Sequence, residues 1–233
     1  MFSKHQKYRK YNYISMLLEY EEEIWKKKQP TKCRCPNCKG KPGRFKLHEK
    51  RVRKILIETD EILEKTTRLL RWKCPLCNKT WTEYPWFIEA NKRYLKPIIV
   101  LKALEYISIG NSTYRGLTSL EKMPIWYNGD EDPDNARSQS HTTLHRWVGW
   151  LGDFEIEVFR YMDWLYQQKP EVEIHRREIL ISRHKYRSER RLSILEVVKR
   201  WSLIAAELVE EKLEKIFLQF APHVGEKTAR LFS

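Results

Sequence analysis

Two Cys-x-x-Cys motifs, at residues 35–38 and 74–77, constrain the fold of this chain more than any other feature. Each motif turns two thiolates toward one point, and two motifs together supply the four soft ligands of a closed tetrahedral zinc site. A thioredoxin-like redox pair has a single such motif in a βαβ setting, so the pair of motifs favours metal binding. We therefore predict one structural Zn²⁺, bound by Cys35, Cys38, Cys74 and Cys77.

Two other side chains compete for a place among these ligands. Cys33 lies just outside the first motif, and His48 follows it in the next predicted strand. The spacing of a Cys-x-x-Cys motif favours Cys35 together with Cys38 over Cys33. An exposed histidine on a strand is more common than one that replaces a cysteine ligand, so neither residue is included in the predicted site.

Residues 33–85 are predicted to form a zinc ribbon with an extended β-hairpin. Residues 39–54 contain eight basic side chains and one acid, which accounts for +7 of the net charge of +14. Alternating side chains predict strands at 51–57 and 68–72, joined through an acidic link at 58–61. Because basic strands suit the phosphate backbone, we expect nucleic-acid contacts from this hairpin. The predicted contact residues are Arg44, Lys46, Arg51 and Arg53.

The charge and cysteine usage limit the partners and the compartment. A net charge of +14 favours nucleic acid over a membrane surface, the plainer alternative being a soluble protein with a basic surface. No apolar run is long enough to span a bilayer, and no apolar segment follows the basic first ten residues. Four of the five cysteines lie in the motifs, which argues against a disulfide framework. We expect a cytoplasmic, nucleoid-associated protein.

Residues 1–32 are predicted to form a basic N-terminal helical arm, with a helix from about 14 to 27. Its apolar spacing favours packing on the body of the protein, and a direct grip on phosphates is the alternative.

Residues 86–152 are predicted to contain a helix-turn-helix. The expected helices run over 97–109, from Ser112 through Leu120, and over 140–151, whereas the acidic loop at 128–135 lacks the spacing of a calcium site. In the last helix an apolar face recurs at i, i+3, i+4 and i+7, and consists of Leu144, Trp147, Val148 and Leu151. The opposite face carries His141, Thr142, Thr143, His145 and Arg146. A recognition helix needs this division, although an ordinary amphipathic helix shares it.

Residues 153–233 are predicted to form a helical region for packing or oligomerisation. The expected helices run over 154–166 and over about 190–220, and the second can pack on the body or pair with another copy as a homodimer. A basic stretch at 176–191 separates them, in which Arg183 and Arg187 are candidate phosphate contacts or part of a solvated connector. The fold class predicted for the whole chain is mainly α with a small β zinc ribbon, hence α+β.

These motifs, in this order, make the chain similar to a largely uncharacterised family of zinc-ribbon plus helix-turn-helix proteins associated with bacterial transposases and mobile elements. The similarity covers about residues 33–152, and its hairpin and Cys33 depart from the family pattern. The residues that match the pattern are Cys35 and Cys38, then Arg71, Lys73, Cys74 and Cys77, then Thr80 or Thr82, Pro85, Phe87, Arg93 and Tyr94, and finally Ser140, Thr143, Arg146 and Trp147.

The resemblance implies a DNA-binding protein, either a regulator or the target- or end-binding subunit of a mobile element. Its partners would be double-stranded DNA and a transposase or recombinase subunit. The alternative is a scaffold subunit of a larger nucleoprotein complex that binds without sequence preference. A divergent transposase is a lesser alternative, because the helical segment at 153–233 leaves no room for the sheet that positions three catalytic carboxylates. We predict no catalytic residues and no enzyme activity.

Overall fold

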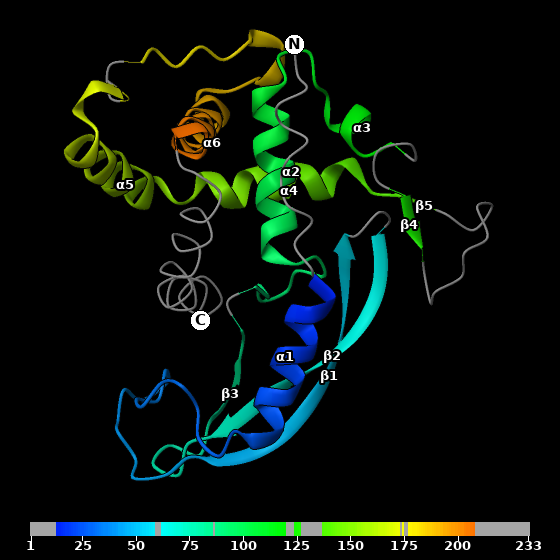
Figure 1. The fold of residues 1–233 in the computed structure, drawn as a ribbon, viewed down its shortest axis with the longest axis vertical. Coiled ribbons are helices and arrows are strands. Elements are labelled where there is room, and N and C mark those ends of the chain that lie inside the picture. The colour runs from blue at the N-terminus through cyan, green and yellow to red at the C-terminus, as the bar shows by residue number, and fades with distance from the viewer. Residues whose placement is uncertain are drawn as a thin grey trace. The chain divides into compact units, whose positions relative to one another are not determined.

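The computed structural model describes residues 13–58, 62–85, 87–119, 124–126, 137–172, 174 and 177–207 (Figure 1). The described residues divide into two compact units, one up to Lys96 and one from Pro97 onward. Helices dominate the second unit and a small antiparallel sheet dominates the first, so the fold is α+β as predicted. No described helix has the length and hydrophobicity needed to cross a membrane.

The first unit is built on three antiparallel strands. They are β1 (Lys46–Glu58), β2 (Ile62–Lys73) and β3 (Thr80–Glu83), with β2 in the middle. The hairpin of β1 and β2 is longer than the predicted strands at 51–57 and 68–72. The register shifts between Leu47 and Glu49, where one extra residue in β1 introduces an irregularity.

Helix α1 (Tyr13–Lys26) packs against this sheet. Ile24 is buried in one cluster with Leu70 and Trp72 of β2. The Glu21 carboxylate accepts hydrogen bonds from the Thr67 hydroxyl at 2.9 Å and from the backbone N–H of Arg68 at 2.8 Å. These contacts favour the packing interpretation of the N-terminal helix. The basic residues before Tyr13 lie outside the described ranges.

The second unit is helical with one short strand pair. Its elements are α2 (Lys96–Ser108, whose first residue belongs to the first unit), α3 (Tyr114–Leu117), β4 (Pro124–Trp126), β5 (Arg137–Ser138), α4 (His141–Gly152), α5 (Glu155–Gln168), the 3-10 turns η3 (Pro170–Val172) and η4 (Arg183–Lys185), and α6 (Glu189–Glu207). The strands β4 and β5 pair antiparallel.

Two of the predicted helix boundaries are shifted. Helix α3 is shorter than the predicted segment from Ser112 through Leu120, and its N-cap is Thr113, whose side chain accepts a hydrogen bond from the backbone N–H of Gly116. Ser112 is buried and donates its hydroxyl to the carbonyl of Tyr106 at 2.6 Å, so it closes the preceding turn instead. The described part of α6 ends at Glu207; the rest of the predicted helix at 190–220 and the loop at 128–135 lie outside the described residues.

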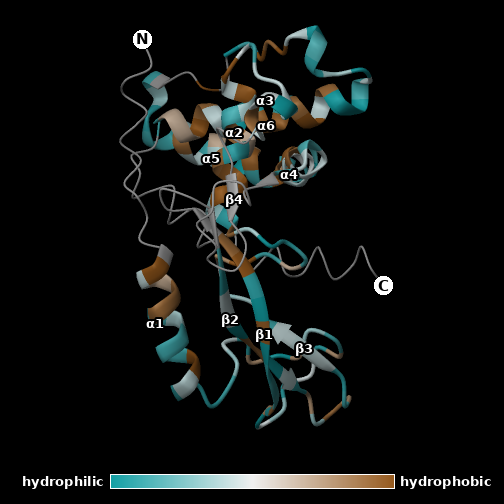
Figure 2. Cartoon of the chain, turned by 90° about the vertical axis from the view of Figure 1, so that its right-hand side faces the viewer, coloured by the Kyte–Doolittle hydropathy of each residue, from teal (hydrophilic) through white to brown (hydrophobic). Residues whose placement is uncertain are grey.

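The core of the second unit lies between α4, α5 and α6. The predicted apolar face of α4 is confirmed, because Leu144, Trp147, Val148 and Leu151 are all buried. Figure 2 shows hydrophobic and hydrophilic residues sharing these helices. A Cβ on Gly152 would lie 2.6 Å from Ile194 Cγ2, so only glycine permits this approach of α4 to α6. The residues that α6 buries are Leu195, Val197, Val198, Trp201 and Ile204.

Candidate metal centre and nucleic-acid surface

The first Cys-x-x-Cys motif folds as a compact knuckle closed by two backbone hydrogen bonds. The N–H of Lys39 donates to the carbonyl of Cys35 at 2.9 Å, and the N–H of Cys35 donates to the carbonyl of Gly40 at 2.9 Å. Lys39 has a positive φ of 59°, the left-handed conformation that reverses the chain direction. The knuckle ends at Gly40, where an added Cβ would lie 2.7 Å from Leu76 Cδ1 of the second knuckle.

The second knuckle repeats this backbone pattern. The N–H of Asn78 donates to the carbonyl of Cys74 at 2.9 Å, and the N–H of Cys74 donates to the carbonyl of Lys79 at 3.0 Å. Asn78 has a positive φ of 58°, which asparagine tolerates better than most residues. Because both knuckles have the same geometry, each presents its two thiols from one side of a tight turn.

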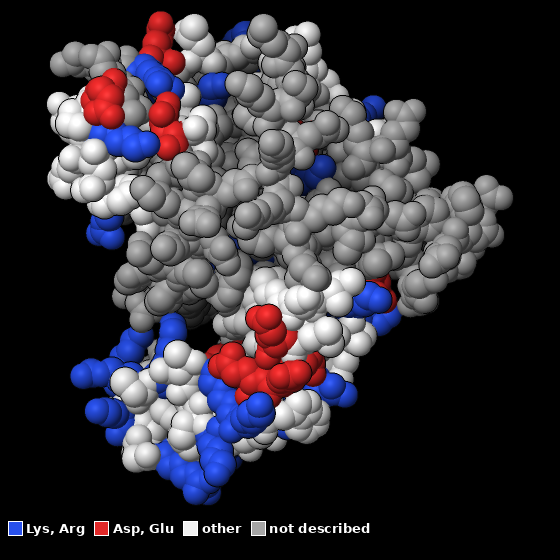
Figure 3. Space-filling view, in the orientation of Figure 1, with Lys and Arg blue, Asp and Glu red and all other residues white. Residues whose placement is uncertain are grey.

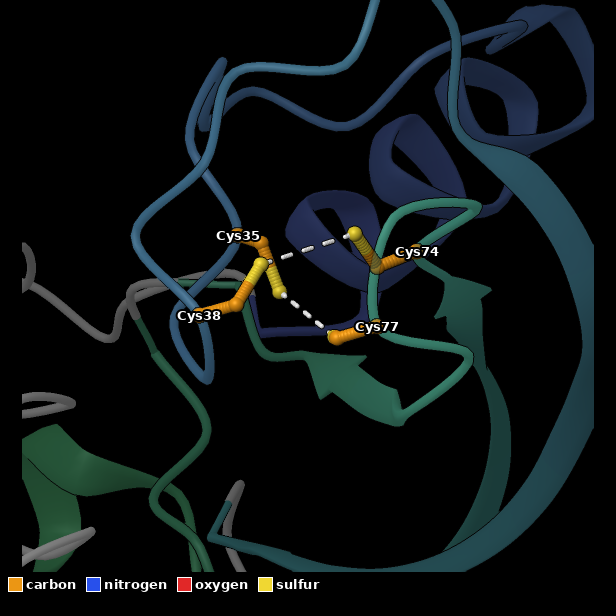
Figure 4. Close-up of side chains that lie close together, drawn as sticks. All are labelled: Cys35, Cys38, Cys74 and Cys77. Carbon is orange, nitrogen blue, oxygen red and sulfur yellow. Dashed lines mark hydrogen bonds between the residues drawn. The ribbon is translucent and has the colours of Figure 1, made fainter.

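The four thiols of the two knuckles point toward one another (Figure 4). The Sγ atoms of Cys35 and Cys77 lie 3.8 Å apart, and those of Cys38 and Cys74 lie 3.9 Å apart. All four ligand atoms lie within 4.8 Å of one another. A tetrahedral ion with metal–sulfur bonds of about 2.3 Å requires sulfur–sulfur separations of about 3.8 Å. The four cysteines can therefore hold one tetrahedral metal ion.

The competing ligands stay outside this group. Cys33 and His48 are both exposed, and neither belongs to the cluster. Within the described ranges, the four knuckle cysteines are the one group of three or more His, Cys, Asp or Glu side chains close enough to share a metal ion.

The surroundings of the thiols shift their pKa values in opposite directions. Burial raises the pKa of Cys35, but hydrogen bonds from the backbone of Cys38 and Asn37 and the neighbouring thiols outweigh it and lower the pKa to about 7. A hydrogen bond from the backbone of Lys79 lowers the pKa of Cys77, but burial and the other three sulfur atoms raise it to about 11. The clustered thiols therefore oppose one another's ionisation, and a divalent cation bound between them would favour the thiolate form of all four.

Apolar and polar side chains of the first unit pack around the knuckles. Cys35 and Cys74 are buried in a cluster with Ile24, Phe45, Leu70 and Trp72. The ring of Phe45 meets that of Trp81 edge-on, with centroids 4.8 Å apart. The backbone N–H of Phe45 donates to the side chain of Gln29 at 2.9 Å.

Glu83 is a supporting residue that the sequence did not reveal. Its carboxylate accepts hydrogen bonds from Trp72 Nε1 at 2.8 Å, from the backbone N–H of Thr31 at 2.7 Å and from Lys27 Nζ at 3.2 Å. It thereby joins β3 to β2 and to the segment that leads into the first knuckle. A lone glutamate at the end of a short strand carries no sequence signal for this role.

The predicted phosphate contacts on the hairpin are not equivalent. Arg44, Lys46 and Arg51 are exposed. The Arg53 guanidinium donates to the backbone carbonyls of Glu89 and Lys92, so it holds the turn that follows β3. Figure 3 shows Lys and Arg side chains gathered around the end of the first unit that carries the knuckles, with acidic side chains over α1 between them.

The polar face of α4 is open to solvent. His141, Thr142, His145 and Arg146 are exposed, and Thr143 is half-buried. The ring of His145 meets that of Tyr114 at 5.4 Å, so α3 contacts α4 beside this face. Burial, followed by the charges of Arg191, Arg146 and His141, lowers the pKa of His145. The lowered pKa favours the neutral imidazole, in which one ring nitrogen is a donor and the other an acceptor.

The predicted contacts Arg183 and Arg187 are exposed on either side of a buried lysine. Lys185 Nζ donates to the carbonyls of Tyr106 and Ile109 at 2.7 and 2.9 Å and to the Ser112 hydroxyl at 3.0 Å. This ammonium satisfies carbonyl groups at the C-terminal end of α2, where a positive charge suits the helix dipole. Lys185 therefore fixes η4, and with it the flanking arginines, against the second unit.

The structure thus gathers the four predicted metal ligands at one point, whereas it distributes the predicted nucleic-acid contacts over β1 and the loop before it, α4 and the region of η4. No protein-family model, curated protein or solved structure matches this chain.

Proposed function

We propose that this chain is a DNA-binding protein whose first unit is held by one structural Zn²⁺ and whose helix α4 contacts the major groove of duplex DNA. In keeping with the family resemblance of its motifs, it would act as a mobile-element regulator or as a target- or end-binding subunit. Zinc is proposed because four thiolates in a tetrahedral arrangement suit it and because a closed site needs no redox chemistry.

The observation that carries the proposal is the division of α4 into two faces. Leu144, Val148 and Leu151 are buried, whereas His141, Thr142 and Arg146 are exposed on the same twelve-residue helix. A helix anchored this firmly can present its polar N-terminal half to base edges without moving. Arg146 has the bidentate fork that suits a guanine edge.

The charge of residues 39–54 supports a second set of contacts. The surplus of +7 in this stretch suits the phosphate backbone, whose contacts fix register but carry no sequence information. We therefore expect this hairpin to add affinity and α4 to add specificity.

The test is a selection of bound fragments from random duplex DNA, with zinc and iron quantified on the same sample by mass spectrometry. We expect one zinc ion per chain and an enriched sequence. Arg146→Ala should cost about 1–3 kcal/mol at one base step and leave the other positions unchanged. Arg160→Ala is the matched control, since Arg160 is an exposed arginine on α5. Fragments with no enriched sequence would exclude base reading by α4.

Exposed apolar side chains on α5 favour a second candidate, the scaffold subunit. Ile156, Phe159, Trp164 and Tyr166 are exposed by 56%, 40%, 39% and 47%. Several large apolar side chains exposed on one helix are typical of a surface that contacts another protein. Under this proposal, the chain binds DNA without sequence preference, and a protein partner increases its affinity for DNA. Trp164→Ala should lower the affinity for that partner and leave the affinity for DNA, measured without the partner, unchanged.

A further inference from the structure

Two lysines face each other directly across the hairpin of the first unit. In the ladder between β1 and β2, Lys46 pairs with Lys73, and in the ladder between β2 and β3, Lys73 pairs with Thr80. Residues paired directly across antiparallel strands point to the same face of the sheet, with Cβ atoms about 4.5–5.5 Å apart. Lys46, Lys73 and Thr80 therefore form one row across all three strands.

Neither lysine has a counter-charge within the described ranges, where no carboxylate lies within ion-pair distance of Lys46 or Lys73. The neighbouring basic residues differ. Arg71, in the next row on the same face, pairs with Glu49 at 3.1 Å, and Lys54 further along β1 pairs with Glu64 at 2.8 Å. Like charges placed directly opposite each other destabilise a sheet. The row therefore lowers the stability of the free protein, which calls for a compensating role.

The second knuckle fixes the geometry of the row. Residues 74–79 connect Lys73, the last residue of β2, to Thr80, the first residue of β3, and the Cys74 N–H to Lys79 carbonyl bond closes that connection. The backbone positions of Lys73 and Thr80 are thus fixed by a closed turn, and that of Lys46 is fixed by its pairing with Lys73 in the β1–β2 ladder. A site with fixed donors loses less entropy when it binds an anion.

We propose that Lys46, Lys73 and Thr80 form a binding site for a backbone phosphate of nucleic acid. Two ammonium groups and a hydroxyl offer donors to the non-bridging oxygens of one phosphodiester, and its negative charge relieves the repulsion between the lysines. This proposal rests on nucleic acid as the partner of the chain. It adds Lys73 and Thr80, which the pattern of the sequence did not single out as contacts.

A competing role for the lysines follows from the metal centre. Four thiolates and one divalent cation carry a net charge of −2, and Lys73 directly precedes the ligand Cys74. If the lysines served only to offset that charge, their removal would weaken metal binding and leave nucleic-acid binding unchanged. The two roles therefore make opposite predictions for one variant.

The test uses the zinc-loaded full chain with the double variant Lys46→Gln/Lys73→Gln. Affinity for a 20-base-pair random duplex is measured by fluorescence anisotropy at several salt concentrations. Each neutralised phosphate contributes about 0.9 to the magnitude of the slope of log K against log salt, so the loss of the one phosphate held by the two lysines should lower that magnitude by about 0.9. Lys54→Gln is the matched control, because this β1 lysine is already neutralised by Glu64, and its slope should match that of the original chain.

The Tm of the double variant, measured with and without duplex DNA, distinguishes phosphate binding from a purely structural role of the two lysines. Removing two opposed charges should leave the Tm unchanged or raise it by a few degrees, while the Tm increase caused by added duplex shrinks. Thr80→Val should reduce affinity by a few fold without changing the salt slope, because it removes a neutral donor.

The failures are distinguishable. An unchanged salt slope in the double variant, with random duplex still bound, overturns the phosphate row and leaves the proposed DNA-binding function standing. A zinc affinity lowered at least tenfold with an unchanged slope assigns the lysines to the metal centre and also overturns the row. If the original chain binds no nucleic acid at any salt concentration, both proposals fail together.

Discussion

The knuckle end of the first unit and the helical second unit reach a defined structure by different means. At the knuckle end, the apolar cluster holds Ile24, Phe45, Leu70 and Trp72 around two of the cysteines. In the second unit, α4 and α6 bury a continuous series of aliphatic and aromatic side chains against each other. The first region therefore combines a small apolar cluster and directed hydrogen bonds with four cysteines that can hold a metal ion, and the second relies on apolar burial.

The difference reflects how far apart in the sequence the contacting residues lie. Cys38 and Cys74 are 36 residues apart, and the loop that follows the first knuckle carries the exposed charged side chains of Lys39, Lys41 and Arg44. Ordering such loops costs conformational entropy that a small cluster cannot offset. A metal ion adds a large local free energy, whereas the helices of the second unit offset the same cost by burying one face each.

The largest expected effect is the loss of the metal ion. Removing it by chelation should unfold the knuckle end, since structural zinc sites contribute on the order of 10 kcal/mol to folding. The fluorescence of Trp72 and Trp81, which lie beside the cysteines, should change, while the helical circular dichroism of the second unit persists. Cys74→Ser should behave like chelation, and Cys33→Ser should behave like the original chain.

A loss of helical signal in parallel with the loss of metal would break the comparison. It would show that the second unit also depends on the metal centre. A knuckle end that stays folded without metal would also contradict the comparison, because the small apolar cluster would then be enough to hold this region folded.

The next largest effect is expected in the core of the second unit. Leu144→Ala should lower the free energy of unfolding by about 2–5 kcal/mol, because Leu144 is fully buried and its removal leaves a cavity. Ile156→Ala is the control, since that side chain is 56% exposed and should change stability by less than about 0.5 kcal/mol. Urea denaturation followed by circular dichroism measures both. A metal affinity unchanged in Leu144→Ala would confirm that the units are stabilised separately.

Lys185 tests the comparison further, because it is a buried charged side chain in the unit that otherwise relies on apolar burial. Burial, with the like charge of Lys199, lowers the pKa of Lys185 to about 8, from 10.5 in an unfolded chain. Between these values the unfolded chain binds the proton more tightly, so the free energy of unfolding should rise with pH above about 8. At about 1.4 kcal/mol per pKa unit, the rise by pH 9.5 is about 2 kcal/mol.

Denaturation at pH 7.5 and pH 9.5 measures this rise, and Lys185→Met should abolish it. The variant is a necessary reference because burial also raises the pKa of Tyr106, which lowers stability above pH 10. A flat profile in the original chain would mean that the three acceptors and the Tyr106 ring, 4.4 Å from Lys185 Nζ, stabilise the ammonium as much as burial disfavours it.

The sequence predicted the features that depend on local spacing. The knuckle cysteines follow from a two-residue gap, and the buried face of α4 follows from a helical repeat that includes Trp147 and Leu151. Helix α2 begins within one residue of the predicted start, because Pro97 favours the first turn.

The features that depend on tertiary partners could not be predicted. The hairpin extends to Lys46 because charged residues continue the ladder where hydrophobic alternation has ended. Arg53 looked like the other basic residues of β1, yet it hydrogen bonds to a turn 36 residues away. Lys185 lay in a basic stretch in which Arg183 and Arg187 are exposed, and only the end of α2 distinguishes it from them.

The smallest expected effect tests whether directed hydrogen bonds stabilise the knuckle end independently of the metal. Glu83→Gln keeps the shape of the side chain but removes the charge that Trp72 Nε1, the Thr31 N–H and Lys27 share. The expected loss is about 1–2 kcal/mol, since hydrogen bonds to a charged group contribute about 1.5–3 kcal/mol and the amide oxygen retains part of that. Glu49→Gln is the control, because its pair with Arg71 is largely exposed and should contribute under about 1 kcal/mol. Zinc-loaded samples in urea measure both. Equal losses in the two variants would mean that the metal and the apolar cluster alone hold this end of the molecule, and that the Glu83 contacts follow from the fold without stabilising it.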